Sequence, residues 1–157
     1  MYGSPTGSDH SFHGLPGKCG KDRAGAPHPL PANLLLPQWI ATHWPKYEEG
    51  GRSVGGTADR ADWRVARTVF VADDEETARS YGKGHKDSPY RYYYGKMLHK
   101  MRILGRLNPF KEDQDMPDED VTLERVLDAL VIAGTAEQVA DQISKLNDEV
   151  GGFGELV

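Results

Sequence analysis

Two stretches of this chain have the apolar pattern of β-strands. In Trp63–Ala72, apolar residues occur on both alternating faces of an extended segment, which predicts a strand covered on both sides. A second apolar run closes the chain at Phe153–Val157. The short segment 131–134 lies between two helical patterns, and we expect it to be a turn.

The other apolar positions have helical spacing, and local signals mark where the helices begin and end. In residues 135–150, Thr135 and Gln138 predict a capping box. Four apolar residues of this segment are spaced for one buried helix face: Val139, Ile143, Leu146 and Val150. Further helices are expected between Pro37 and Gly50, after Asp73 or Asp74, from about Pro89 to Leu104, and from Thr122 to Leu130.

Strands that alternate with helices predict an α/β protein built from parallel strands. Parallel strands need neighbours on both sides, yet only two clear strand candidates are present. A closed (β/α)8 barrel takes about 250 residues, and this chain has 157. We therefore expect an incomplete α/β unit.

Residues 1–31 differ from the rest of the chain. They are rich in Gly, Pro, Ser and His and have almost no periodic apolar positions. Such a segment cannot bury enough apolar surface to offset the entropy cost of ordering it. We expect a disordered or non-native leader here, and a second region at residues 32–157.

Several segments of residues 32–157 resemble consecutive segments of the bacterial luciferase-like flavin-dependent monooxygenases, in particular the limonene-monooxygenase-like branch. The resemblance rests on ANLLLPQWIATHWPKYEEG, DWRVARTVFVADDEETAR, SPYRYYYGKML and VTLERVLDALVIAGTAEQVADQISKLNDEVGGFGELV. Several segments in the usual order are more specific than one short motif.

The resemblance implies that residues 32–157 are the C-terminal piece of a (β/α)8 TIM barrel. It also implies oxygen insertion with reduced FMN and O2 into a small organic substrate, with a separate flavin reductase. A deazaflavin is the less favoured cofactor, and a homo-oligomer is compatible with the family. Barrel active sites use the carboxyl ends of all eight strands, so this piece holds a minority of the site. The catalytic and cofactor-binding residues therefore stay unassigned.

The charge and hydropathy patterns exclude several classes of partner. The net charge is −5 and the basic residues are scattered among acidic ones, so no basic stripe for nucleic acid is present. No apolar run approaches the roughly 20 residues that span a bilayer. The one cysteine, Cys19, cannot form an intramolecular disulfide. We expect a cytoplasmic protein without nucleic-acid or membrane partners.

Two motifs in the leader favour no site. GLPGKCGKD at residues 14–22 resembles a phosphate loop, but Leu15 and Asp22 stand where glycine and Ser/Thr are required. A zinc site could in principle use leader residues, but their spacing matches no usual ligand pairs: His10, His13, Cys19 and His28. We predict no metal site.

Arg91 and the run Tyr92, Tyr93 and Tyr94 form the most suggestive polar and aromatic cluster. A guanidinium beside aromatic rings can hold a flavin phosphate or line an apolar substrate pocket. The alternative is plain helix packing with one phenol that reaches a partner, because only one or two neighbouring tyrosines share a helix face. His43 is a further pocket candidate, since histidine can act as a base near neutral pH.

Two hypotheses about function follow. In the first, the chain is part of a luciferase-like monooxygenase that uses reduced FMN and O2. In the second, the chain alone is a catalytically inactive piece or a partner-binding module, because unpaired strand edges invite association.

Overall fold

The structure is a computed structural model, and it describes residues 30–157. The leader predicted for residues 1–31 lies, up to residue 29, outside the described residues. The main helices are α1 (Pro37–Ala41), α2 (His43–Ser53), α3 (Glu75–Arg79), α4 (Pro89–Ile103), α5 (Leu123–Leu130) and α6 (Ala136–Val150). The strands are β1 (Arg64–Val65), β2 (Thr68–Val71), β3 (Val131–Gly134) and β4 (Glu155–Leu156). Short 3-10 turns cover Arg60–Asp62, Asn108–Phe110 and Asp118–Asp120, and a π-helical turn covers Ser80–Gly84.

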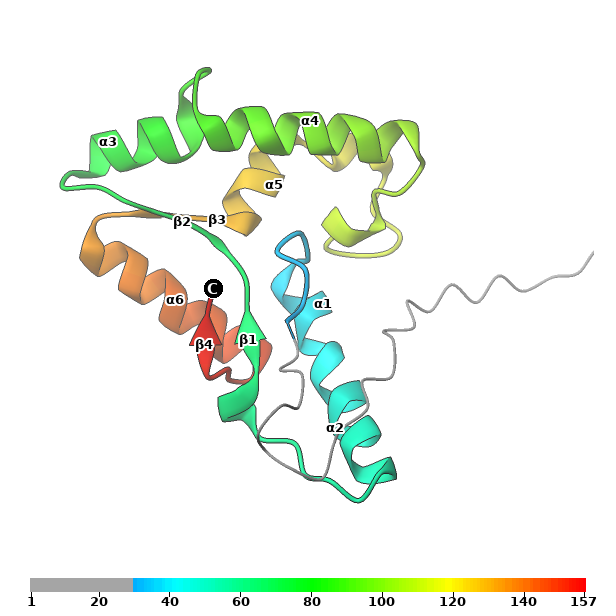
Figure 1. The fold of residues 1–157 in the computed structure, drawn as a ribbon. Coiled ribbons are helices and arrows are strands. Elements are labelled where there is room, and N and C mark those ends of the chain that lie inside the picture. The colour runs from blue at the N-terminus through cyan, green and yellow to red at the C-terminus, as the bar shows by residue number, and fades with distance from the viewer. Residues whose placement is uncertain (1–29) are drawn as a thin grey trace, which may run out of the picture.

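The strands form two short parallel pairs. β1 pairs with β4, and β2 pairs with β3, with Val69 opposite Ile132. The two strands predicted at 63–72 and 153–157 are therefore parallel neighbours, as expected. Among the described residues no closed barrel forms, and the architecture is mixed α/β (Figure 1).

The prediction of a turn at 131–134 was wrong, because this segment is strand β3. Four residues are too few to show the two-residue alternation of a strand. The segment is a strand because its backbone pairs with β2. The predicted strand 63–72 is interrupted at Ala66 and Arg67, which separate β1 from β2. Each half then pairs with a different strand.

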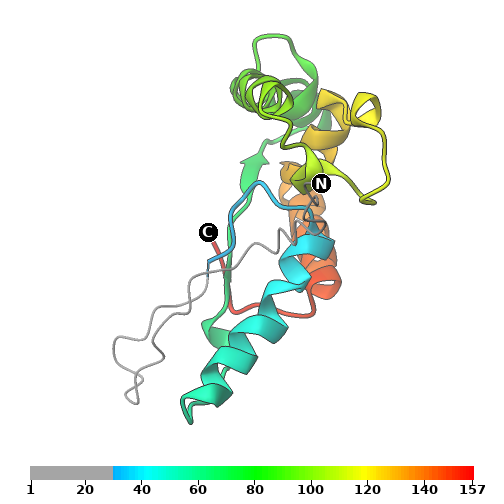
Figure 2. The same ribbon diagram turned by 90° about the vertical axis from the view of Figure 1, so that its right-hand side faces the viewer.

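Two apolar clusters cover opposite faces of β3, because successive side chains of a strand point to opposite sides. Val131 belongs to the first and Ile132 to the second. The first cluster lies under α4 and α5 and contains Leu36, Tyr94, Leu98, Leu107, Phe110, Val121, Val126, Leu127, Leu130 and Val131. The second lies between α1, α2, α6 and β1 and contains Ile40, Trp44, Trp63, Val65, Ile132, Val139, Leu146 and Val150. In both views α4 and α2 lie at opposite ends of the unit (Figure 2).

The predicted helix α6 is confirmed in its start, its end and its buried face. Thr135 and Gln138 form both hydrogen bonds of the capping box, and Gly151 ends the helix with a φ of 81°. Val139, Leu146 and Val150 are buried, and Ile143 is half-buried against the same cluster. The capping box and the apolar stripe are local signals, which explains why the sequence located this helix well.

The N-terminal helical region differs from its prediction. Pro37–Gly50 is two helices, α1 and α2, and α2 continues through Gly50 and Gly51 to Ser53. Arg60 fixes this region to the end of α6. Its guanidinium lies 4.4 Å from the ring centroid of Trp44, and it donates hydrogen bonds to the carbonyl oxygens of Val150 and Gly152. A cation at a helix C-terminus is favourable because it complements the helix dipole.

Candidate functional site

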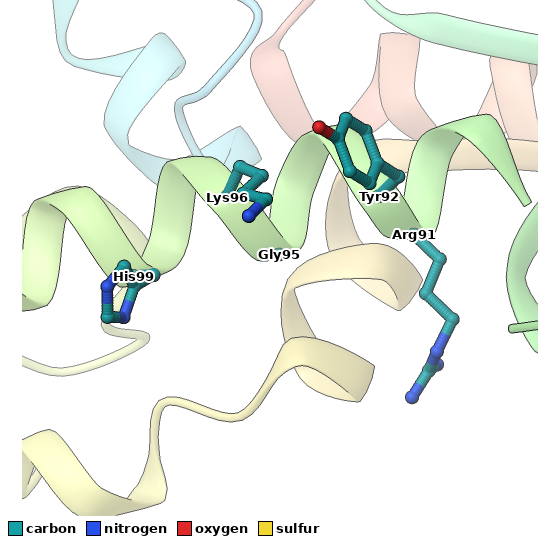
Figure 3. Close-up of a pocket in the computed structure, with 5 residues that line it drawn as sticks. All are labelled: Arg91, Tyr92, Gly95, Lys96 and His99. Carbon is teal, nitrogen blue, oxygen red and sulfur yellow. The ribbon is translucent and has the colours of Figure 1, made fainter. Parts of the chain in front are cut away.

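Helix α4 carries a shallow surface hollow of about 410 Å³. It is lined by Arg91, Tyr92, Gly95, Lys96 and His99, which follow one face of the helix (Figure 3). Ser88 caps the start of the helix by accepting a hydrogen bond from the Arg91 backbone N–H, and Pro89 occupies the first turn. These local signals position the hollow on a helix that the sequence predicts almost to the residue.

Arg91 is held in place from two sides. Its Nη2 donates to Glu124 Oε1 on α5 at 2.6 Å, and its Nη1 donates to the carbonyl oxygen of Lys83 at 3.4 Å. The hydrogen bond from Arg91 lowers the pKa of the Glu124 carboxyl. The guanidinium is thus oriented, but one carboxylate already neutralises part of its charge.

The other lining groups supply one aromatic ring and further cationic or titratable groups. The Tyr92 side chain is 68% exposed, and the Lys96 ammonium lies 5.7 Å from its ring centroid. His99 lies one helical turn beyond Gly95 (Figure 3). The pair of Tyr92 and Lys96 suits a ligand that carries a small anionic group on a flat ring: the cation can bind the anionic group, and the exposed aromatic ring can stack on the flat ring.

Tyr93 does not join this hollow. Its ring is exposed and packs edge-on against Tyr94, with 5.1 Å between the ring centroids. It also departs from the buried helix stripe, which Tyr94 and Leu98 occupy. Tyr94 is fully buried, its hydroxyl is hydrogen-bonded to the Thr68 hydroxyl at 2.9 Å, and burial raises its pKa. Tyr94 is therefore the phenol that reaches a packing partner.

His43 also lies apart from the α4 hollow. It is the first residue of α2, its side chain is exposed, and it is absent from the lining of the hollow. Although the residue is exposed, neighbouring groups remove part of its hydration, and this desolvation lowers the pKa of its imidazole. Of the four pocket candidates, the structure brings together Arg91 and Tyr92.

A second hollow, of about 400 Å³, was missed by sequence reasoning. It lies where β3 ends and helices α3 and α6 begin, and its lining carries both charges: Glu75, Ala78, Arg79, Lys83, Ala133, Gly134, Gln138, Asp141 and Gln142. Ligands of parallel α/β proteins usually bind at the carboxyl ends of the strands. The available signal was Gly134 before the capping box, directly after an apolar run.

The strand end is tied closely to α6 at this second hollow. Gln138 Oε1 accepts the Thr135 backbone N–H, and Gln142 Nε2 donates to the carbonyl oxygen of Ala133. A Cβ at Gly134 would lie 2.7 Å from the Cβ of Gln138, so a larger residue would push the helix away. Both glutamine side chains are therefore structural anchors as well as lining groups.

Two further properties concern the described residues alone. Within residues 30–157, no group of three or more His, Cys, Asp and Glu side chains is arranged to hold a metal ion. None of the helices in this range combines the length and the apolar character that crossing a membrane requires.

Comparisons with known proteins agree on one class. The chain is 31% identical over 155 residues to limonene 1,2-monooxygenase of Rhodococcus erythropolis, which covers 98% of this chain and 35% of the relative. It is 31% identical over 119 residues to 3,6-diketocamphane 1,6-monooxygenase of Pseudomonas putida, which covers 74% of this chain and 30% of the relative. No protein-family model matches the chain.

A solved structure supports the same relation. It is the oxygenating constituent of 3,6-diketocamphane monooxygenase from Pseudomonas putida in complex with FMN, a type II Baeyer-Villiger monooxygenase. The match has a TM-score of 0.62 and 27% identity, and covers 74% of this chain and 32% of that one.

All of these similarities are to monooxygenases, one of which was solved in complex with FMN. The chain belongs with the luciferase-like group that includes limonene and diketocamphane monooxygenases, as the sequence resemblance suggested. The chain spans about a third of the length of the relatives it matches.

Proposed function

We propose that this chain is part of a luciferase-like monooxygenase that uses reduced FMN and O2 to oxygenate a small organic substrate. The observation that carries the proposal is the 31% identity to limonene 1,2-monooxygenase over almost the whole chain. The parallel strand pairs, with a hollow where β3 ends, are compatible with a C-terminal part of a (β/α)8 barrel. A separate flavin reductase and assembly into a homo-oligomer belong to the same proposal.

FMN is favoured over a deazaflavin, because the related diketocamphane enzyme was solved in complex with FMN. When bound, the reduced flavin supplies the electrons that activate O2. The donors in the α4 hollow suit its phosphate, since Arg91 and Lys96 are cationic and both line it. The apolar walls that bury a flavin ring are not among the five lining residues, so contacts to the ring must come from elsewhere in the assembled protein.

Within this proposal, Arg91 and Tyr92 are the pocket residues to test. The guanidinium of Arg91, which donates a hydrogen bond to Glu124, would orient an anionic group of the ligand. The exposed ring of Tyr92 would stack against a flat part of the ligand. His43 and Tyr93 are the weaker candidates because neither lines the hollow. The second hollow, at the end of β3, is the other place where this chain would contribute polar contacts.

A chimera tests the proposed function directly. The part of limonene 1,2-monooxygenase that matches residues 32–157 is replaced by these residues, and oxygenation of limonene is measured with reduced FMN and O2. We expect FMN binding and product formation, with a weaker FMN affinity in Arg91→Ala than in the matched control Arg106→Ala. A folded chimera that binds no FMN and forms no product would overturn the proposal.

A second candidate is that the chain alone is a catalytically inactive, partner-binding module. The observation that favours it is that the strands of residues 30–157 form two separate two-stranded pairs, and unpaired strand edges invite association. The purified chain is titrated with FMN while flavin fluorescence and molecular mass are followed. No saturable binding is expected, and micromolar binding by a compact monomer would contradict this candidate.

A further inference from the structure

Residues 88–111 differ in charge from the rest of the chain. They contain six Lys and Arg residues and no Asp or Glu, whereas the whole chain has a net charge of −5. Basic and acidic residues are mixed over the full sequence, which conceals this segment. It consists largely of helix α4 and the turns that follow it. A basic helix in an acidic chain raises the question of what its cations face.

Three of the six cations face α5 and the loop before it. Arg91 and Lys111 form ion pairs with carboxylates of these elements, and Arg102 donates a hydrogen bond to a backbone carbonyl oxygen of the loop. The other three cations are exposed, and none forms an ion pair with a residue in the range 30–157: Lys96, Lys100 and Arg106. These three charges are therefore available to a partner outside this part of the chain.

The same face of α4 exposes large apolar side chains. Ile103 is 71% exposed in the last turn of the helix, Leu104 is 51% exposed at its C-cap, and Tyr93 is exposed near its start. Residues three, four and seven positions apart share a helix face. One outer strip of α4 therefore carries cations between an aromatic end and an aliphatic end: Tyr93, Lys96, Lys100, Ile103 and Leu104. Of these five residues, Lys96 alone lines the α4 hollow.

The position of α4 in the fold turns this outer strip away from the strands. The opposite face of the helix is buried in the first apolar cluster through Tyr94 and Leu98. In both views α4 runs along one end of the unit (Figures 1 and 2). The helices of a (β/α)8 barrel form its outer ring and pack their inner faces on the strands. A face opposite to that packing therefore lies on the outside of such a barrel as well.

We infer that the outer strip of α4 docks on the surface of an anionic phospholipid membrane, with the helix axis parallel to the membrane plane. Lys96 and Lys100 bind the anionic headgroups, and Ile103 and Leu104 insert their side chains below them. Tyr93 suits the headgroup level, where aromatic rings with one polar end are enriched. The expectation that the chain has no membrane partner rested on the lack of a spanning run, which has no bearing on a helix that lies on the surface.

The chemistry of the outer strip favours a membrane over other anionic partners. A nucleic-acid backbone would engage the lysines and could stack bases on Tyr93, but it would leave Ile103 and Leu104 in water. An acidic protein surface presents carboxylates at fixed positions, which suit the rigid fork of arginine better than flexible lysine ammonium groups. A headgroup layer needs no fixed geometry, and its acyl boundary accepts the aliphatic end of the strip.

Vesicle cosedimentation of the whole chain, without flavin, tests the inference independently of the proposed function. We expect binding to phosphatidylcholine vesicles that contain phosphatidylserine, no binding to pure phosphatidylcholine vesicles, and weaker binding at high salt, which screens the lysine charges. Lys100→Gln should weaken binding about fivefold, which is the usual contribution of one cation near an anionic leaflet. Lys145→Gln is the matched control, because Lys145 is an exposed lysine on a different helix, α6.

The apolar end of the strip is tested in the same assay. Ile103→Asn should weaken binding roughly fivefold or more, because it removes an apolar side chain from the acyl boundary. Val54→Asn is its matched control, since Val54 is an exposed aliphatic residue on the C-cap of α2. The side chains changed in these variants are exposed, so all four variants should keep the unfolding midpoint of the parent chain.

A fluorescent label then shows which part of the chain touches the membrane. Ile103→Cys and, separately, Val54→Cys are labelled with an environment-sensitive dye in a Cys19→Ser background. On phosphatidylserine vesicles the dye at position 103 should brighten and shift to the blue, and the dye at position 54 should not. Absence of vesicle binding, equal binding to pure phosphatidylcholine, equal weakening by the control variants or equal dye responses would each overturn the inference. Binding of a DNA duplex, or self-association, through Lys100 in place of vesicle binding would overturn it as well.

Discussion

The inner face of α6 offers the sharpest test of the fold. Leu146 is 5% exposed within the cluster that joins α6 to α1, α2 and β1. Truncation of a buried leucine to alanine removes its transfer free energy and leaves a cavity, at a cost of 2–5 kcal/mol. Because Leu146 is almost fully buried among large side chains, we expect about 3 kcal/mol. Its neighbour Lys145 is 77% exposed, so Lys145→Ala is a matched control on the same helix with an expected change within about 0.5 kcal/mol.

Urea unfolding and thermal unfolding, each followed by circular dichroism, measure both variants. In a unit of this size, 1 kcal/mol corresponds to roughly 3–4 °C in Tm, so Leu146→Ala should lower Tm by about 10 °C. The loss of stability in Ile143→Ala should lie between those of Leu146→Ala and Lys145→Ala, because Ile143 is half-buried. Equal effects of Leu146→Ala and Lys145→Ala would show that α6 does not bury this face, and would refute the packing described above.

Three further predictions concern single contacts. Gly82→Ala should destabilise by about 1–3 kcal/mol, because the new Cβ would lie 2.6 Å from a β3 side chain, whereas Gly50→Ala meets nothing within 4 Å and should not destabilise. Tyr94→Phe should cost about 1 kcal/mol in chemical denaturation by removing the hydrogen bond to Thr68, and an unchanged midpoint would argue against that bond. Hydrogen bonds from the first turn of α3 lower the pKa of Asp74. The ionised carboxylate therefore stabilises the fold at neutral pH, and this contribution is lost as the pH falls through the folded-state pKa. In Asp74→Asn, the free energy of unfolding should decrease less steeply as the pH is lowered through this range.

The sequence predicted those features that depend on residues a few positions apart. The capping box of Thr135 and Gln138, the Asp74 cap of α3 and the Pro89 start of α4 all lie where local spacing indicated. Each of these signals acts over about one helical turn, so neighbouring residues suffice to define it. The resemblance to luciferase-like monooxygenases also needed only the linear order of segments.

The candidate site was predicted only in part. Arg91 and Tyr92 were singled out as neighbours in the sequence, and Lys96 and His99, which complete the hollow, lie at helical spacing from Tyr92. The hollow at the end of β3 could not be predicted, because it needs the distant elements α3 and α6 side by side. Its residues look like ordinary helix surface in the sequence.

Sequence alone therefore determined where α3, α4 and α6 begin, which face of α6 is apolar, and the family to which the chain is related. Tertiary structure decided that Val131–Gly134 is a strand, that β4 pairs with β1, and that Arg60 lies against Trp44. The physical reason is that strands acquire their hydrogen bonds from segments far away in the chain, whereas a helix satisfies most of its bonds within itself.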